Sequence, residues 1–330
     1  MTELLRVAGL RITTGARAGG RVLVRDMSLS LSAGESIGLV GESGSGKSMT
    51  ARAVMRLLPP SFEVGGEVDF DGRSIYAMSK TDLRSYRAND VAMIFQDPRA
   101  HTNPVRKVGD FMTEAMRAKG GTSRAAATLA AERMLGEVGI PQPARRLRQY
   151  PHELSGGMLQ RVMIAAAFCS ELRLLLADEP TTALDVTTQS DIMATVEGLR
   201  RERAMALLFI TLELAAATCD RIAVMYAGTL VETGPAAVIE GRPNHPYTVG
   251  LLRSRPPIDR RVDRLDAIPG RPVSAHEAPS GCVFQTRCPH VVDRCRKETP
   301  TPRAIRGTVV ACHRAGEAPV RTEVPGAPGE

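Results

Sequence analysis

Apolar side chains recur along the chain with different spacings, and each spacing predicts a different kind of element. Residues 4–12 and 21–31 alternate apolar with polar side chains, which predicts strands of an antiparallel hairpin or small sheet. Short runs that are almost wholly apolar predict buried strands, and they occupy residues 36–40, 90–95, 172–177, 205–211 and 221–226. Stretches of helical character lie between them, at residues 49–58, 158–169 and 187–203. Strands that alternate with helices predict an α/β fold with a parallel sheet covered by helices.

Residues 99–150 are predicted to be mainly helical. Within this segment Ser123 is suited to cap a helix that Gly139 ends. One face of this helix is expected to carry Ala127, Ala131, Met134, Leu135 and Val138. Earlier in the chain, a further hairpin is predicted at residues 66–72, which end in an Asp-Gly turn signal.

Composition and charge narrow the functional classes. A chain of 330 residues is long enough for one large α/β domain and a small appendage. The net charge of +7 would suit nucleic acid, but Trp is absent and no aromatic-basic platform occurs, so no nucleic-acid partner is expected. No apolar run is long enough to span a bilayer, and no signal-peptide pattern begins the sequence. The protein is therefore expected to be cytoplasmic, and docking on a membrane protein stays open.

The most informative stretch of the sequence reads Gly41-Glu42-Ser43-Gly44-Ser45-Gly46-Lys47-Ser48. It lies between a predicted strand and a predicted helix, which is the context of a phosphate-binding loop. Its glycines let successive backbone N–H groups point at one anion, and the start of the helix adds partial positive charge. Lys47 would reach the β- and γ-phosphates of a nucleotide, and Ser48 would hold Mg²⁺. Met49 is the last residue assigned to this loop.

Two neighbouring carboxylates, Asp178 and Glu179, follow the apolar strand at residues 172–177. The carboxyl end of a strand beside a phosphate loop is where a second Mg²⁺ anchor belongs, and Asp178 is predicted to take that role. Glu179 would then be the general base that orients and activates the attacking water. The alternative is an acidic pair that caps a helix.

Several motifs in a fixed order resemble the nucleotide-binding subunit of an ABC transporter, over about residues 4–247. They are the phosphate loop, Gln96, Leu154-Ser155-Gly156-Gly157 with Gln160-Arg161, the strand that ends in Asp178-Glu179-Pro180, and Ala183-Leu184-Asp185. The tetrapeptide that begins at Leu154 is the most specific, since it separates ABC ATPases from other phosphate-loop enzymes. Residues 95–98 and 244–248, with the Cys-rich end, resemble the oligopeptide/dipeptide importer subclass, to which nickel importers are closely related.

The resemblance implies a phosphate-loop ABC ATPase domain at residues 1–252. This domain would contain a RecA-like core, an antiparallel β subdomain and a helical subdomain at about residues 99–160. Residues 253–314, which are rich in Pro, Arg and Cys, are expected to form a separate small Cys-rich domain. Residues 315–330 are expected to be a flexible tail.

The resemblance also implies two nucleotide domains packed head to tail around ATP. Ser155, Gly156 and Gly157 would face the γ-phosphate held by the partner, Gln96 would sense the γ-phosphate and Mg²⁺, and Asp185 would contact the partner. The helical subdomain would receive a coupling helix from two transmembrane permease subunits, and an extracytoplasmic substrate-binding protein would act indirectly. The chain would then work at the cytoplasmic face of the cell membrane and power import of di- or oligopeptides or related small solutes.

Two departures from the family concern the nucleotide site. The family usually stacks adenine on an aromatic residue near the first strand, and this chain has no aromatic residue before Phe62. Leu212 stands where the family has a His that contacts the γ-phosphate, and leucine has no hydrogen-bond donor. We therefore expect a site on this chain's own loop that binds ATP and turns it over poorly, paired with a more active site on a different partner chain. Two alternatives stay open: Glu179 alone suffices for turnover, or the subunit is regulatory and does not hydrolyse ATP.

Four of the six cysteines lie in the C-terminal part, at Cys282, Cys288, Cys295 and Cys312. Disulfides are not expected in a cytosolic chain, and four thiolates suit either zinc or an iron–sulfur cluster. Spacings wider than those of zinc knuckles favour the larger group. The importer resemblance implies a [4Fe-4S] cluster, with zinc and free or redox-active thiols as alternatives.

A different class of ABC ATPase acts without a transporter, on ribosomes or DNA. Such proteins carry two nucleotide domains in one chain or a long coiled-coil insertion, and this sequence has neither. The identity of the solute is not encoded in this chain, because a binding protein and the membrane subunits would set it.

Overall fold

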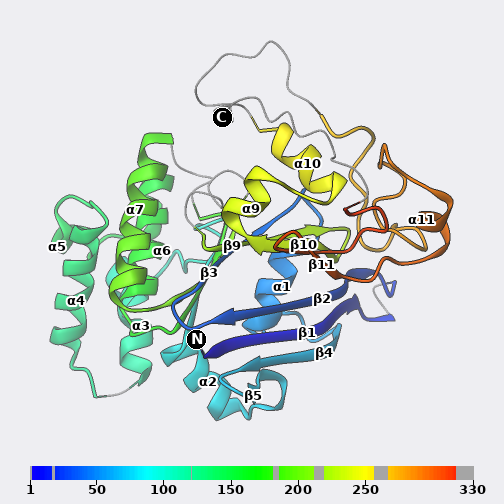
Figure 1. The fold of residues 1–330 in the computed structure, drawn as a ribbon. Helices are drawn as coiled ribbons and strands as arrows, with labels where there is room; N and C mark the ends of the chain where they lie inside the picture. The colour runs from blue at the N-terminus through cyan, green and yellow to red at the C-terminus, as the bar shows by residue number, and fades with distance from the viewer. Residues whose placement is uncertain are drawn as a thin grey trace. The chain divides into compact units, whose positions relative to one another are not determined.

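The computed structural model describes residues 2–16, 19–119, 121–180, 186–211, 219–255 and 267–316. Two compact units make up the chain. Figure 1 shows the helices and strands along the chain. The first unit contains Met1–Leu5, Leu31–Ser36 and Asp69–Ile210, and the second contains Arg6–Ser30, Ile37–Val68 and Thr211–Glu330. Each unit is described by itself below.

The sheet of the first unit is parallel. Strand β7 (Leu174–Asp178) lies between β6 (Val91–Ile94) and β8 (Ala206–Ile210), and both pairings are parallel. Every residue of β7 and β8 is buried, as expected for parallel strands that are covered on both faces. The parallel arrangement predicted from the apolar runs is confirmed for these three strands.

Helices make up most of the rest of the first unit. They are α2 (Lys80–Asn89), α3 (Val108–Lys119), α4 (Arg124–Glu137), α5 (Pro143–Arg146), α6 (Gly156–Phe168) and α7 (Val186–Glu202), with 3₁₀ turns at Ile75–Ala77 and Pro151–Glu153. Helices α3, α4 and α6 contact one another pairwise. The prediction for α4 is confirmed, because the Ser123 hydroxyl accepts a 3.1 Å hydrogen bond from the N–H of Ala126 and the predicted apolar face is buried. Gly139 follows with a φ of 73°.

The second unit contains a mixed sheet with the strand order β4 (Phe62–Phe70), β1 (Glu3–Thr14), β2 (Val22–Ser32), β10 (Thr229–Pro235), β9 (Arg221–Tyr226) and β3 (Ser36–Val40). Strand β3 is parallel to β9, whereas β9 and β10 are antiparallel. The predicted turn at Asp71-Gly72 connects β4 to β5 (Arg73–Ser74), and both turn residues have positive φ. The strands expected at 4–12 and 21–31 are therefore present.

One helix prediction was wrong at its end. Helix α1 (Lys47–Val54) begins inside the predicted phosphate loop, but it ends four residues before Leu58. Arg56 adopts a left-handed φ of 51°, which ends the helix before the two prolines are reached. The predicted helix was too long because Leu57 and Leu58 continue the apolar pattern past the observed end.

The Cys-rich part does not form a separate domain in the described residues. It contains α11 (Asp293–Lys297), β11 (Arg303–Ile305) and β12 (Thr308–Val310), and it follows α9 (Ala236–Gly241) and α10 (Pro246–Arg253). Strand β12 pairs with β10, with Glu232 opposite Val310, so this part extends the sheet of the second unit. The expectation of an independent Cys-rich domain is not confirmed, and the boundaries at 252 and 314 stay predictions.

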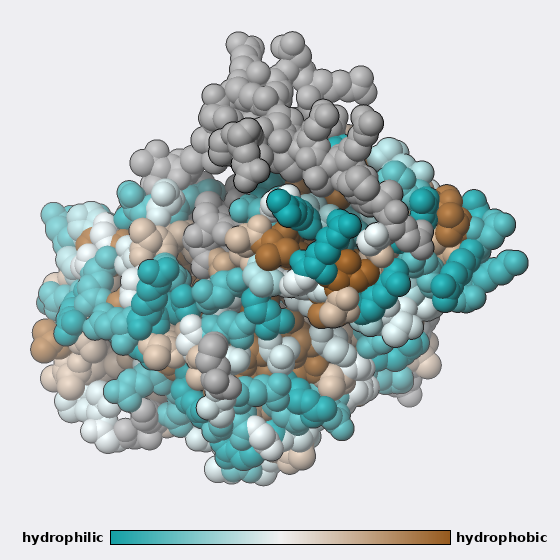
Figure 2. Space-filling view, viewed as in Figure 1, coloured by the Kyte–Doolittle hydropathy of each residue, from teal (hydrophilic) through white to brown (hydrophobic). Residues whose placement is uncertain are grey.

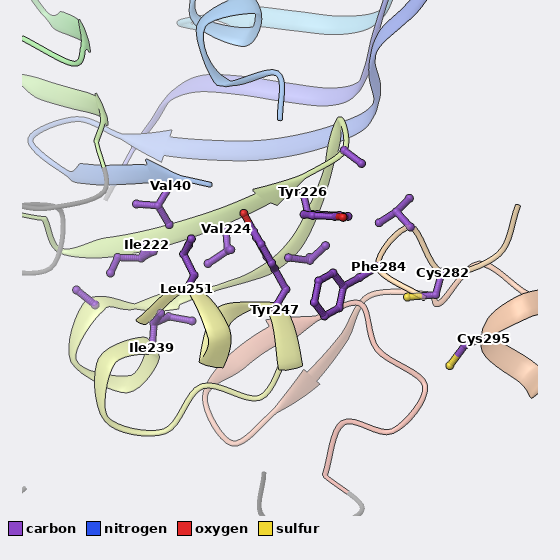
Figure 3. Packing of buried hydrophobic residues seen from close by; sticks show 14 residues of the cluster. Val40, Ile222, Val224, Tyr226, Ile239, Tyr247, Leu251, Cys282, Phe284 and Cys295 are labelled. Carbon is purple, nitrogen blue, oxygen red and sulfur yellow. The ribbon is translucent and has the colours of Figure 1, made fainter. Parts of the chain in front are cut away.

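A hydrophobic cluster connects this part to the sheet (Figure 3). Tyr226 from β9, Tyr247 from α10 and Phe284 pack ring against ring, with centroids 4.6 to 5.3 Å apart. Cys282 and Cys295 belong to the same cluster and lie at its end beyond Phe284. Burying these aromatic rings contributes several kcal/mol (about 1.5–3 kcal/mol for each side chain), which explains why the C-terminal segment stays on the sheet.

On the face drawn in Figure 2, hydrophilic residues predominate and hydrophobic ones form small separate areas. In the part of the chain that the structure describes, the exposed large apolar side chains come from separate segments: Leu57, Val105, Leu129, Val292 and Val309. Within the described residues, no helix is long and apolar enough to cross a bilayer.

Candidate functional site

The predicted phosphate loop connects β3 to α1 in the second unit. Gly46 has a φ of 104°, and a Cβ at this position would lie 2.9 Å from the carbonyl oxygen of Leu23 and 2.8 Å from Cε of Met225. A side chain is therefore excluded on two grounds, backbone conformation and space. The first N–H groups of α1 lead out of this turn, so the loop has the form expected of an anion cradle.

Lys47 is the first residue of α1, and its side chain is 8% exposed. Its ammonium group donates hydrogen bonds to the carbonyl oxygens of Gly41 (2.6 Å) and Glu42 (3.0 Å), so it lies back across the loop. The buried hydroxyl of Ser45 has no hydrogen-bond partner within the described part of the chain. An unpaired buried hydroxyl in a ring of amides is the kind of group that a phosphate oxygen would satisfy.

Glu42, also in this loop, is bound from the C-terminal part of the chain. Its N–H donates a 2.8 Å hydrogen bond to the hydroxyl of Tyr247, and its carboxylate forms a bidentate ion pair with Arg287 at 2.6 and 3.0 Å. Burial by itself would lower the pKa of Arg287, but the hydrogen bonds to Glu42 and Tyr226 raise that pKa overall. Neither contact could be predicted from the pattern of residues in the sequence.

In the first unit, two of the predicted site residues are in direct contact. Gln96 follows β6 and Glu179 follows β7, and the Gln96 amide donates a 2.6 Å hydrogen bond to the Glu179 carboxylate. Glu179 has a left-handed φ of 46°, unusual for a residue with a side chain. Asp178, the last residue of β7, is 3% exposed. The two carboxylates thus occupy the carboxyl end of a buried parallel strand, as predicted.

The tetrapeptide at residues 154–157 forms the start of α6. Leu154 is buried, and the exposed Ser155 is the N-cap, with its hydroxyl accepting a 3.2 Å hydrogen bond from the N–H of Met158. Gly156 and Gly157 make up the first turn of the helix, where backbone N–H groups have no partner within the helix. Further along, the fully buried Gln160 donates a 2.7 Å hydrogen bond to the carbonyl of Pro180. Helix α6 is therefore bound, through Gln160, to the residue after Glu179.

Comparisons with known proteins agree with this geometry. The profile of the ABC transporter family matches residues 24–182, and that of the oligopeptide/dipeptide transporter C-terminal region matches residues 231–295. The chain is 43% identical to the oligopeptide transport ATP-binding protein OppD of Salmonella typhimurium, over 95% of this chain and 94% of that protein. A probable peptide ABC transporter ATP-binding protein of Sinorhizobium fredii is 47% identical over 86% of this chain and 87% of its own length. The chain belongs to the oligopeptide/dipeptide family of ABC transporter ATP-binding subunits.

Solved structures support the same fold. The dimeric structure of a bacterial ABC transporter cassette matches with a TM-score of 0.63 and 24% identity, over 71% of this chain and 99% of that chain. This likeness shows the ABC cassette fold. As a member of this family, the chain is an ABC transporter ATPase, a translocase.

The motif Ala183-Leu184-Asp185 and the position Leu212 lie outside the described part of the ABC subunit. Asp185, predicted to contact a partner, and Leu212, at the position of the family His, belong to segments that the structure does not describe. Thr211, directly before Leu212, is buried. The roles assigned to these residues, and to the phosphate-loop, Gln96, Asp178, Glu179 and Ser155 groups, stay predictions.

The motif at residues 244–248 in this ABC subunit has a structural explanation. The N–H groups of Asn244 and His245 donate hydrogen bonds of 2.7 and 3.0 Å to the buried carboxylate of Glu232. Burial raises the pKa of Glu232, and these hydrogen bonds partly offset that effect. His245 caps α10 through a 3.0 Å bond from the N–H of Tyr247 to Nδ1, which directs the Tyr247 ring towards Glu42. The motif was visible in the sequence, but its link to the phosphate loop was not.

The four C-terminal cysteines converge without forming a metal site. Burial, with smaller contributions from the charges of Cys295, Cys312 and Cys288, raises the pKa of Cys282 to about 12, so the four thiols lie near enough to interact. Cys282 also donates its backbone N–H to the carbonyl of Cys295 at 2.8 Å. Among the described residues, however, no three His, Cys, Asp or Glu side chains are arranged to hold a metal ion. The predicted iron–sulfur ligands are brought together, and the cluster itself is not supported.

Proposed function

We propose that this ABC ATPase binds and hydrolyses ATP to power the import of di- or oligopeptides through a membrane transporter. The observation that carries the proposal is the identity of 43% with an oligopeptide transport ATP-binding protein over nearly the whole chain, together with the match to the oligopeptide/dipeptide C-terminal region. That second match includes Tyr247 and Arg287, which contact the phosphate loop. The chain therefore resembles peptide transporter subunits both in the phosphate loop and in the C-terminal residues that contact this loop.

The residues present fit ATP with Mg²⁺. The unpaired Ser45 hydroxyl, the left-handed Gly46 and the helix start at Lys47 form a cradle for phosphate oxygens. Ser48, Gln96 and Asp178 would hold Mg²⁺, which when bound neutralises charge on the β- and γ-phosphates. Lys47 would exchange its two loop carbonyls for phosphate oxygens. Glu179, oriented by Gln96, would accept the proton of the attacking water.

The proposed transporter contains further subunits that this chain would contact. Ser155, Gly156 and Gly157 would face the γ-phosphate on a second nucleotide-binding subunit, and Asp185 would contact that subunit. The first unit contains a pocket of about 550 Å³ lined by residues of α2, β6, α3 and α6. A coupling helix from the permease subunits would bind in this pocket. Within it Phe95 and His101 stack with centroids 3.8 Å apart. An extracytoplasmic binding protein would supply the solute, and this subunit would sit at the cytoplasmic face of the membrane.

The proposal includes unequal nucleotide sites. Leu212 removes a donor to the γ-phosphate from the site on this chain's own loop, while Ser155, Gly156 and Gly157 remain for the site on the partner. The partner is then a different chain, and its site carries most of the hydrolysis. The test is to replace the partner's catalytic glutamate by glutamine. Loss of nearly all ATPase activity supports unequal sites, and retention of about half contradicts them.

The overall function is tested by purifying the subunit with its neighbours and reconstituting the assembly in vesicles. We expect two membrane proteins and a second nucleotide subunit to co-purify, and uptake of labelled peptides to require ATP. Lys47→Ala should abolish nucleotide binding to this chain. Uptake of nickel in place of peptides would favour the nickel-importer alternative. A variant of this chain that binds ATP without hydrolysing it could still support transport, while a variant that cannot bind ATP does not. That result would favour a regulatory subunit.

We also propose that Cys282, Cys288, Cys295 and Cys312 bind a [4Fe-4S] cluster, with zinc as the alternative. The proposal rests on the proximity of the four thiols, whose charges act on Cys282, and on the small amount of apolar packing around Cys312. The side chains would have to move together, because the described arrangement does not form a ligand set. Brown protein with absorbance near about 400 nm after anaerobic purification is expected. Colourless protein that contains zinc would show that the cysteines bind zinc and not an iron–sulfur cluster.

A further inference from the structure

Every polar group of Glu42 in the phosphate loop is bound. Its N–H donates to the Tyr247 hydroxyl at 2.8 Å, its carbonyl accepts from the Lys47 ammonium at 3.0 Å, and its carboxylate pairs with Arg287. Two of these three partners come from the C-terminal part, 205 and 245 residues further along the chain. The conformation of the loop at Glu42 is therefore defined from outside the loop.

Arg287 is itself held in place. It is 7% exposed, and its guanidinium donates to the carbonyls of Pro269 (2.8 Å) and Ile268 (3.2 Å) and to the Tyr226 hydroxyl at 3.5 Å. With the two bonds to Glu42, the planar group is fully committed to one geometry. Because contacts other than those to Glu42 also hold the guanidinium, it acts as a rigid anchor for Glu42.

The sign of the charges matters as much as the geometry. Glu42 carries its carboxylate inside a loop whose proposed ligand is a polyphosphate, and two negative groups at close range repel each other. Arg287 neutralises that carboxylate and draws it to the side of the C-terminal segment. If Arg287 were removed, the carboxylate would be free to turn back, and the loop would lose both an anchor and its charge balance.

We propose that Arg287 is a positioning residue of the nucleotide site, acting through Glu42 to keep the phosphate loop open to ATP. The inference rests on the proposed function, because it assigns the C-terminal segment a part in nucleotide affinity at the same loop. Tyr247 contributes to the same effect through the Glu42 N–H. A cation that only stabilises the fold would change the thermal midpoint and leave affinity unchanged.

The experiment measures the affinity of the full chain for a fluorescent ATP analogue with Mg²⁺, alongside thermal unfolding without nucleotide. Arg287→Ala is expected to weaken binding by about tenfold or more, because it leaves the partly buried carboxylate of Glu42 without its cation. The matched control is Arg271→Ala, which breaks a bidentate pair with Glu277 in the same segment. That pair is exposed, so the control should stay within about twofold of the parent.

A second variant separates charge from shape. Glu42→Gln keeps the size of the side chain and removes its charge, so in the Arg287→Ala background it should restore most of the lost affinity. Glu42→Gln alone should weaken binding less than Arg287→Ala does. Such non-additivity is what a direct pair predicts, whereas two independent structural defects would add.

The outcomes are distinguishable. If the parent chain binds no nucleotide, the proposed function fails; if the parent binds and Arg287→Ala binds equally well, this inference is overturned. Should Arg287→Ala fail to fold, Tyr247→Phe and Arg287→Lys provide the test, since each removes only part of the support. Weakened binding by both, with an unchanged thermal midpoint, supports the inference. Parent-like affinity in both rejects it.

Discussion

The side-chain amide of Gln96 donates a 2.6 Å hydrogen bond to the carboxylate of Glu179. Two further features fix the acceptor: Glu179 has a left-handed backbone conformation, and its N–H donates to the carbonyl of Ile210 at 2.9 Å. The proposed general base is thus oriented by groups that belong to one compact unit. What the predicted site lacks is a donor at Leu212, not the base.

The first prediction follows from this contrast. Leu212→His should raise ATP turnover at this chain's own site by about tenfold or more, because an imidazole restores a contact to the γ-phosphate next to a carboxylate that is already oriented. The measurement is steady-state ATPase activity of the assembly in which the partner's catalytic glutamate is glutamine. That background reports only on the site that contains Glu179.

The control for this gain is Gln96→Ala together with Leu212→His. Loss of the amide removes the hydrogen bond that orients the Glu179 carboxylate, so the gain should disappear while nucleotide stays bound. If Leu212→His leaves turnover unchanged, the loss of the histidine is a neutral replacement and the unequal-site hypothesis is wrong.

The second prediction compares two residues of this chain that would serve different sites. Ser155→Arg should lower ATPase activity of the assembly by roughly 10²-fold, because it blocks the helix start that faces the partner's ATP. Glu179→Gln should lower it by less than about threefold, because it affects only the slower site. Equal losses from the two variants would indicate two equivalent sites.

Helices, strands and turns that depend on residues close together in the chain could be predicted from the sequence. The helix capped by Ser123, the strand that ends at Asp178 and the turn at Asp71-Gly72 all follow from local periodicity and capping, and each is present. The end of α1 was misjudged, since a left-handed Arg56 has no signal in the pattern of apolar residues. Local patterns name the elements better than their ends.

Long-range contacts account for what could not be predicted. Glu42 and Arg287 are 245 residues apart, and neither belongs to a pattern whose spacing would pair them. The Cys-rich part appeared separate because its composition changes, yet β12 pairs with β10 and Phe284 packs on Tyr226. The composition of a segment does not reveal whether it packs against the rest of the chain. Here that packing depends on a few buried side chains of the Cys-rich part.

The third prediction concerns the cysteines. If the four thiols hold a cluster or zinc, Cys295→Ser should lower the thermal midpoint by at least about 5 °C and reduce the metal content, because bound metal contributes to folding. The matched control is Cys169→Ser, at the end of α6, which should leave metal content unchanged. Metal-free parent protein with the same midpoint as Cys295→Ser would mean that the thiols act only as packing groups.

The fourth prediction is a pH dependence of stability at His245. Burial lowers the pKa of this histidine from 6.5 to about 3, and its Nδ1 must stay unprotonated to accept the N–H of Tyr247. Since the unfolded chain binds the proton near pH 6.5, this group costs no stability above that pH. Between pH 6.5 and about 3 the cost grows, reaching about 2 kcal/mol at pH 5.

His245→Asn tests this directly, because Asn can accept the same N–H as a helix cap and does not titrate. The decrease in unfolding free energy from pH 7 to pH 5 should be smaller in this variant by about 2 kcal/mol, measured by denaturant titration. Glu232 has the opposite effect, since burial raises its pKa and protonation at low pH stabilises the fold. It is present in both proteins and largely cancels in the comparison. An identical pH dependence in the two proteins would show that His245 titrates normally in the folded chain.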